Sequence, residues 1–218
     1  MRLAQIQMAV TADKVENLRH AEALLASVKG ADMAVLPEMF CCPYDNACFR
    51  AYSEPEGGPA YQMLSRTARE LNLWLVGGSL PELDGDKIYN TAYVFDPTGT
   101  CVARHRKMHL FDIDVAGGQR FFESDTLSPG QQYTLVDTPF GKLGVAICFD
   151  VRFAELFRIL ALEGAQLIVV PAAFNMTTGP AHWELLFRAR ALDNQCFLAG
   201  CAPARDETAG YVSYAHSL

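Results

Sequence analysis

The chain has 218 residues, of which 50% are hydrophobic and 20% are charged, and its formal net charge is −7. This composition excludes disordered and fibrous proteins and fits one globular domain, which we expect to span residues 1–218. The negative charge argues against nucleic acid as a partner, because a phosphate-binding surface needs clustered Lys and Arg. No apolar run approaches the roughly 20 residues that span a bilayer, and the N-terminus lacks a signal-peptide pattern. We therefore expect no membrane partner and a cytoplasmic location, with a mitochondrial one as the alternative.

The predicted elements begin with an alternation of strands and helices. They are a strand at 3–10, a helix at 13–28, a strand at 32–36 and a helix at 59–71. Apolar residues at helical spacing predict one buried face of the first helix, made of Val15, Leu18, Ala21, Leu25 and Val28. We interpret the next three strands as an antiparallel meander joined by turns rich in Pro, Asp and Gly, at 73–80, 88–95 and 101–105.

A polar, glycine-rich loop is predicted from about residue 112 to residue 131. Its Gly117-Gly118 pair is read as a turn, because no Walker or G-x-G-x-x-G pattern surrounds it. Alternation then returns with a strand at 143–148, a helix at 152–163, a strand at 166–171, a helix at 180–193 and a strand at 196–201. The chain ends in an apparent strand at 211–218. The whole pattern favours an α/β protein.

The cysteine pattern bears on compartment and on metal binding. Seven cysteines are an odd number, and their spacing has no disulfide rhythm, which favours a reducing compartment. No C-x-x-C pair, H-E-x-x-H helix or other ligand spacing occurs in the sequence. We therefore predict no metal site.

Cys148 stands between an apolar strand and the start of an amphipathic helix. The N-terminus of such a helix carries partial positive charge, and its free N–H groups can hold a developing anion, so both favour a thiolate. Asp150 is the predicted N-cap of that helix. A thiol at this position can be a nucleophile, and the alternative is inert packing, which is commoner for a cysteine at the end of an apolar strand.

Two further residues extend this prediction. Glu38 follows a predicted buried strand, and burial would raise its pKa toward the range of a general base; the alternative is an exposed loop carboxylate. Lys107 follows the last strand of the meander, where a cation can stabilise an oxyanion; the alternative is a solvated strand end. We predict structural roles for His105, His109 and His182, because none lies in a protease-like context.

Three segments carry a resemblance to a known family. They are LPEMF at 36–40, RKMHLFDID at 106–114 and GVAICFDVRFAEL at 144–156. In sequence and in order they resemble the signature segments of the nitrilase superfamily. Further stretches at 123–130, 174–190 and 202–217 resemble its omega-amidase branch, whose members deamidate 2-oxo acid amides.

The resemblance implies a four-layer αββα sandwich and a Glu-Lys-Cys triad, carried onto Glu38, Lys107 and Cys148, with Glu123 as a supporting carboxylate. It implies an amidase that works through a cysteine thioester, with the backbone N–H of Phe149 helping to hold the oxyanion and with no cofactor. Glu123 on a solvated surface is the alternative for that residue.

The implied substrates are 2-oxoglutaramate and 2-oxosuccinamate, which carry a carboxylate remote from the amide. Such a carboxylate calls for a cation or several hydrogen-bond donors, and Arg152 is our candidate, with a structural salt bridge as the alternative. Tyr44 is expected to close the pocket, and Phe174, Met176 and Thr178 are expected to line it, with packing as the competing role for each.

The resemblance also implies a homodimer. Members of the family continue beyond the segment that resembles 211–217, so we expect the chain to be incomplete at its C-terminus and to lack the last strands of the sandwich. Lower stability than that of a full-length relative is the expected consequence. Two alternatives to an omega-amidase stay open, namely another superfamily amidase, such as one that acts on deaminated glutathione, and a shortened non-catalytic chain that acts through subunit interaction.

Overall fold

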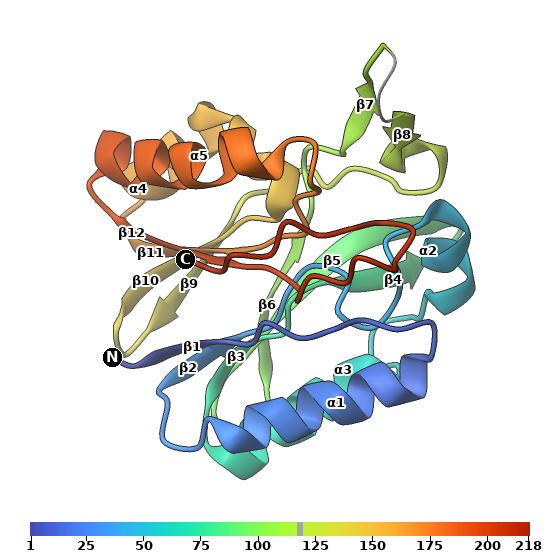
Figure 1. Ribbon diagram of the computed structural model, residues 1–218. Helices are drawn as coiled ribbons and strands as arrows, with labels where there is room; N and C mark the ends of the chain where they lie inside the picture. The colour runs from blue at the N-terminus through green and yellow to red at the C-terminus, as the bar shows by residue number, and fades with distance from the viewer. Residues whose placement is uncertain (117–119) are drawn as a thin grey trace.

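The computed structural model describes residues 1–116 and 120–218, so the turn predicted at Gly117-Gly118 lies outside the described residues. Two sheets face each other, and two pairs of helices cover their outer faces (Figure 1). The predicted four-layer αββα architecture is confirmed. Among the described residues, no helix is both long and apolar enough to cross a membrane.

The first sheet has six strands in the order β1-β2-β3-β5-β4, with β6 paired to β5. They are β1 (Leu3–Gln5), β2 (Met33–Val35), β3 (Trp74–Val76), β4 (Leu80–Asp84), β5 (Lys87–Phe95) and β6 (Cys101–Arg106). β1, β2 and β3 are parallel, whereas β4, β5 and β6 form an antiparallel meander. The strand predicted at 73–80 is therefore two strands, because the chain turns at Gly78, which has φ +60°.

The second sheet has the order β12-β11-β10-β9. Its strands are β9 (Thr134–Thr138), β10 (Gly141–Val145), β11 (Ala165–Pro171) and β12 (Phe197–Cys201). The last three strands are parallel, and β9, which the sequence analysis missed, pairs antiparallel with β10. The predicted 112–131 loop is also more ordered than expected, because it contains β7 (Asp112–Asp114), β8 (Arg120–Phe122) and the 3₁₀ helix η1 (Glu123–Asp125).

The helices cover the outer faces of the sheets. α1 (Lys14–Ser27) and α3 (Pro59–Leu71) lie on the first sheet, and α4 (Ala154–Leu162) and α5 (Gly179–Asn194) lie on the second (Figure 1). The sequence analysis missed α2 (Asn46–Tyr52), which has only seven residues. The predicted apolar face of α1 is wrong at Val15, which is 75% exposed, whereas Ala21 and Leu25 are buried as expected.

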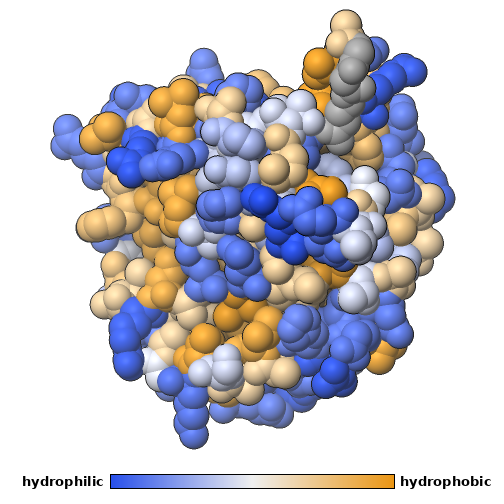
Figure 2. Space-filling view, viewed as in Figure 1, coloured by the Kyte–Doolittle hydropathy of each residue, from blue (hydrophilic) through white to orange (hydrophobic). Residues whose placement is uncertain are grey.

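Two apolar cores result from this layering. One lies between the sheets and continues to α4 and α5, and the other lies between the first sheet and helices α1 and α3. The strand predicted at 211–218 is wrong, because this segment makes only scattered pairings, such as the two backbone hydrogen bonds between Leu218 and Gly200 at 2.7 and 3.0 Å. It runs back across the side of the molecule between the two sheets (Figure 1). On this side the surface is mixed, with apolar residues exposed among polar ones (Figure 2).

Candidate active site

Glu38 lies in a tight turn just beyond β2. The backbone N–H of Met39 donates to Ser79 Oγ at 3.1 Å, and that of Phe40 donates to the Ser79 carbonyl at 3.2 Å. A Cβ on Gly78 would come within 2.2 Å of the Pro37 carbonyl oxygen, so glycine is needed for this close approach. The turn buries Glu38 to 1% exposure, which rules out the exposed-carboxylate alternative.

Lys107 follows β6 directly and is also fully buried. Its N–H donates to the Asn90 carbonyl at 2.9 Å, and its own carbonyl accepts from Gly130 at 2.8 Å, which fixes the backbone on both sides. Its Nζ lies 2.8 Å from Glu38 Oε1 and 2.9 Å from Glu123 Oε2. The solvated strand end that served as the alternative is therefore excluded.

Glu123 begins η1 and completes the charged cluster. Its side chain is fully buried, and it accepts a hydrogen bond from the Phe111 N–H at 2.6 Å and one from the Tyr44 hydroxyl at 2.6 Å. Lys107 Nζ also lies 3.3 Å from Tyr44 Oη. The ammonium thus contacts two carboxylates and one hydroxyl, and Glu123 is not the surface residue of the alternative prediction.

Burial and the charges of Glu38, Lys107 and Glu123 together determine the pKa values in this cluster. Burial raises the pKa of Glu38, the Lys107 ammonium opposes that rise, and the Glu123 carboxylate adds to it. Burial alone would lower the pKa of Lys107, but the Glu123 and Glu38 carboxylates outweigh it, and the net pKa is raised. Lys107 therefore stays charged, while Glu38 becomes more basic than an ordinary glutamate.

The two oxygens of Glu38 have different surroundings. Oε1 accepts from Lys107 and from Asn90 Nδ2, each at 2.8 Å. Oε2 is buried and has no hydrogen-bond partner within the described part of the chain. The Cys148 thiol is close enough to perturb the pKa of Glu38, and the Glu38 carboxyl in turn perturbs that of Cys148.

Cys148 lies at a sharp bend two residues beyond Ala146, and its φ of +44° is in the left-handed region. It starts the five-residue 3₁₀ helix η2 (Cys148–Arg152), and α4 begins only at Ala154. Burial, followed by the Glu38 carboxylate, raises the pKa of Cys148 well above its usual range. The expectation that a helix N-terminus would favour the thiolate is therefore wrong, because the α-helix starts too late and burial dominates.

Asp150 is not the predicted N-cap of α4. Its carboxylate instead accepts from the Ile147 N–H at 2.9 Å and from the His109 N–H at 2.9 Å, and it also contacts His105 Nε2 at 3.2 Å. Burial alone would raise its pKa, but the hydrogen bonds from His105 and His109 outweigh it, and the pKa lies well below the usual range. This carboxylate connects the turn at Cys148 with the segment that follows Lys107.

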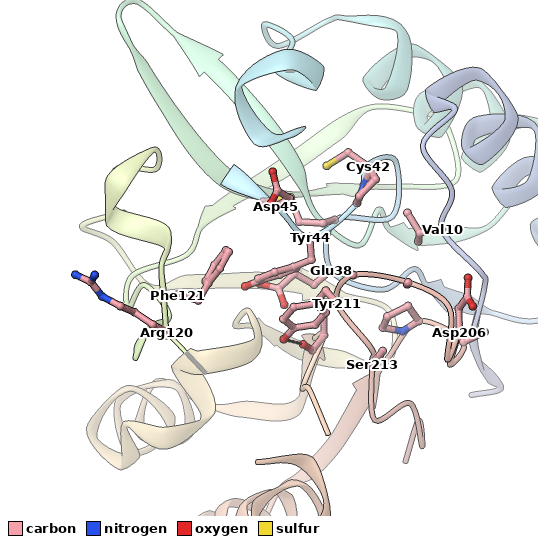
Figure 3. A pocket seen from close by; sticks show the side chains of 17 residues that line it. Val10, Glu38, Cys42, Tyr44, Asp45, Arg120, Phe121, Asp206, Tyr211 and Ser213 are labelled. Atoms are coloured by element: carbon pink, nitrogen blue, oxygen red, sulfur yellow. Dashed lines mark hydrogen bonds between the residues drawn. The ribbon is translucent and has the colours of Figure 1, made fainter. Parts of the chain in front are cut away.

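Two cavities adjoin the cluster. The larger, of about 450 Å³, is lined by Glu38 and Tyr44 together with parts of the 203–213 segment (Figure 3). The smaller, of about 10 Å³, is lined by Cys148, Phe149, Arg152, Phe174 and Thr178, among others. Met176, which was expected to line the pocket, is 40% exposed and lines neither cavity.

Arg152 lines the same small cavity as Cys148. No ion pair of Arg152 with a carboxylate occurs among the described residues, and its nearest polar contact is His182 Nδ1, at 3.2 Å from both terminal nitrogens. Its guanidinium carbon lies 5.2 Å from the ring centre of Phe149 and 5.3 Å from that of Phe174. Burial lowers its pKa, and its Nε is buried without a partner within that same part of the chain. The salt-bridge alternative for Arg152 is not supported.

The sequence analysis missed two residues of this site. Asn90 is a buried polar residue in β5, and an amide among the mostly apolar residues of the predicted strand at 88–95 was the signal available in the sequence. Tyr211 stacks on Tyr44 with ring centres 4.6 Å apart, and its hydroxyl donates to the Ala173 carbonyl. No spacing rule would have singled out Tyr211, because it reaches the site from the far end of the sequence. No cluster of three or more potential metal ligands occurs among the residues described.

Comparisons with known proteins agree with this architecture. Residues 2–218 match the model of the carbon-nitrogen hydrolase family. Omega-amidase NIT2 of Danio rerio is 55% identical over 218 residues, which cover 99% of this chain and 79% of that protein. The crystal structure of Saccharomyces cerevisiae Nit3, a member of branch 10 of the nitrilase superfamily, has a TM-score of 0.90 at 41% identity, over 99% of this chain and 80% of that chain.

A third similar structure has a modified cysteine in its active site. A mutant of the amidase from Nesterenkonia sp. AN1, with acrylamide added at its active-site cysteine, has a TM-score of 0.83 at 29% identity, over 100% of this chain and 84% of that chain. The chain described here belongs to the carbon-nitrogen hydrolase family of the nitrilase superfamily.

Proposed function

We propose that the chain is an omega-amidase, which hydrolyses 2-oxoglutaramate and 2-oxosuccinamate to the 2-oxo dicarboxylic acid and ammonia. The observation that carries this proposal is a buried Glu38–Lys107 pair next to Cys148, whose pKa is raised. Arg152, which has no carboxylate partner among the described residues, lines the same small cavity as Cys148. The similarity to proteins named omega-amidase, at 50–55% identity, supports the choice of substrate.

Acylation begins with Glu38 as the base. Its free Oε2 accepts the Cys148 proton as the sulfur attacks the amide carbon. Because burial keeps the thiol protonated, the base is required at the moment of attack. The oxyanion is held by Lys107 and by the Phe149 N–H. Tyr44 makes the longest of the contacts to Lys107, at 3.3 Å, so it is the partner that the oxyanion would replace.

The carbon–nitrogen bond then breaks, and the nitrogen takes the proton from Glu38 and leaves as ammonia. The acyl group remains on Cys148 as a thioester. Glu38 next takes a proton from water as the water oxygen attacks the thioester carbon, and it returns that proton to the departing sulfur. Glu123 keeps Lys107 charged and in place through this cycle.

We assign the remote carboxylate of the substrate to Arg152. The guanidinium is half-buried between two aromatic rings and offers donors that meet no acid within the described residues. The present pocket of about 10 Å³ holds no more than a water molecule. Binding of the acyl group therefore requires this cavity to widen.

The experiment that tests this function is ammonia release by the purified chain from 2-oxoglutaramate, from the amide of deaminated glutathione and from a simple neutral amide. The proposal predicts that turnover of 2-oxoglutaramate is fastest and that Cys148→Ala abolishes it. Faster turnover of deaminated glutathione would assign the chain to another amidase class. No turnover by folded protein would favour a non-catalytic role in subunit interaction.

We also propose that the chain forms a homodimer through the outer face of α4 and α5. Both helices carry large apolar side chains that are strongly exposed, including Leu162 at 76%, Leu185 at 66% and Leu192 at 78%. Light scattering after size-exclusion chromatography tests this assembly. A dimer that Leu192→Lys dissociates would support the proposal, and a monomer at micromolar concentration would oppose it.

A further inference from the structure

Tyr211 lies between the two cavities of the site, and the residues proposed for proton transfer and for acyl binding line different cavities. Tyr211 and Ala173 line both cavities. Glu38 lines the larger cavity and not the smaller, whereas Cys148 and Arg152 line the smaller and not the larger. The proposed proton-transfer group and the proposed acyl-binding groups therefore line different cavities, and Tyr211 borders both.

The Tyr211 ring is held by stacking on one neighbouring ring and by a hydrogen bond from its hydroxyl. It stacks on Tyr44 with an interplanar angle of 28°, and its hydroxyl donates to the Ala173 carbonyl. In the larger cavity, Tyr211 lies beside Tyr44 and Glu38 (Figure 3). Burial raises the pKa of Tyr211, and the Cys148 and Glu38 charges raise it further, as expected for a ring next to the reacting groups. The ring occupies space on the Glu38 side of the nucleophile.

The position of the Tyr211 ring affects both the nitrogen that leaves the substrate and the water that attacks the thioester. In the proposed reaction, Glu38 protonates the departing nitrogen and later deprotonates the attacking water, so both must lie on the Glu38 side. A substituent on that nitrogen, or an acceptor larger than water, would meet the Tyr211 ring. An aromatic ring at such a point discriminates by size, because its stacking on Tyr44 and its hydrogen bond to the Ala173 carbonyl resist its displacement.

We propose that Tyr211 is a specificity-determining residue that restricts the leaving group to ammonia and the acyl acceptor to water or amines of similar size. The inference rests on the proposed function and deepens it. The reaction it controls is transfer of the acyl group from the Cys148 thioester to an amine. The amine nitrogen bonds to the acyl carbon, the carbon–sulfur bond breaks, and the amine proton passes through Glu38 to the sulfur.

The test measures how the thioester divides between acceptors. The wild-type protein reacts with 2-oxoglutaramate in the presence of equal concentrations of hydroxylamine and benzylamine, and mass spectrometry gives the ratio of the benzyl amide to the hydroxamate. We expect almost no benzyl amide from the wild type. Tyr211→Ala should raise the ratio at least about tenfold, because a cavity replaces the ring. Tyr211→Phe should leave the ratio near the wild-type value, because the ring remains.

The product ratio is independent of how much active enzyme each sample contains, so partial unfolding of a variant does not change it. Tyr211→Leu provides a second, better-packed variant, for which we expect an intermediate ratio. Tyr133→Ala is the matched control, since Tyr133 is 45% exposed and lines neither cavity. An unchanged ratio in both Tyr211→Ala and Tyr211→Leu would overturn the inference.

Failure of the proposed function gives a different result. Intact-mass measurement detects the acyl group on the wild-type protein before any acceptor is added. An acylated wild type with an unchanged ratio in the variants refutes only the role of Tyr211. A wild type that is never acylated by any amide refutes the amidase function, and the inference falls with it.

Discussion

Lys107 Nζ lies 2.8 Å from Glu38 Oε1, and neither side chain has any exposed surface. A buried charge pair is held only where each partner compensates the other, so removal of one partner is costly. Here the single ammonium forms ion pairs with two carboxylates, Glu38 and Glu123. Lys107 therefore supports the fold of the site as well as the chemistry assigned to it.

Lys107→Met tests this double role. The substitution leaves two buried carboxylates without a cation, and we expect the free energy of unfolding at neutral pH to fall by about 3 kcal/mol. We expect kcat to fall by about 10²-fold or more, because the oxyanion loses its cation. Urea denaturation and ammonia release measure the two effects. Lys87→Met, at an exposed position of β5, is the control and should change neither. Unaltered stability of Lys107→Met would contradict the account.

Glu123→Gln should change the pH dependence of the reaction. The Glu123 carboxylate adds to the rise in the pKa of Glu38 that burial causes. A neutral amide removes that contribution, so the pKa of Glu38 should fall, and the acidic limb of kcat/KM should move to lower pH by about one unit. A pH profile of kcat/KM from pH 4 to 9 measures it, with Glu163→Gln at an exposed position as the control. A limb that moves to higher pH would refute the assignment of Glu38 as the base.

Asp150→Asn should reduce stability in a pH-dependent manner. The folded-state pKa of Asp150 lies below its unfolded value of about 3.9. Its stabilising contribution is therefore complete above that value and is lost as the pH falls through the folded-state pKa. We expect a loss of about 2–3 kcal/mol at pH 7, because hydrogen bonds to a charged group are removed. Denaturation at pH 7 and pH 3 should show a smaller difference at pH 3, and an equal difference at both would contradict this account.

Arg152→Gln should weaken binding of anionic substrates selectively. The proposed carboxylate contact would lose its charge, so we expect KM for 2-oxoglutaramate to rise by about 10- to 100-fold. KM for a simple neutral amide should change little. The comparison of the two substrates is the measurement, and Arg188→Gln, on the exposed side of α5, is the control. Equal loss for both substrates would show that Arg152 acts only through the structure.

Local sequence patterns predicted much of the fold, and their failures have physical reasons. The helix predicted at 59–71 has the bounds of α3, whose first turn contains Pro59. The seven residues of α2 are too few for a periodic pattern. The segment at 211–218 has a strand-like composition, but its pairing partners are single residues of other segments, and the pattern of one segment cannot reveal them.

The sequence indicated the main residues of the candidate site but not their protonation states or supporting contacts. The signature segments brought forward Glu38, Lys107 and Cys148, and the fold brings the first two into contact, with the third next to Glu38. The protonated state of Cys148 was not predicted, because it depends on burial and on a neighbouring charge rather than on the position of a helix. The role of Asp150 in binding His109 depends on tertiary contacts between separate loops, which no single segment encodes.

The most direct test of the central claim is detection of the acyl group on Cys148. The protein is mixed with 2-oxoglutaramate, quenched in acid within milliseconds to seconds, and digested for mass spectrometry. The account predicts a transient acyl adduct on the peptide that contains Cys148, which is lost on incubation with hydroxylamine and is absent from Cys148→Ala. Steady ammonia release by Cys148→Ala, or an adduct confined to another residue, would contradict it.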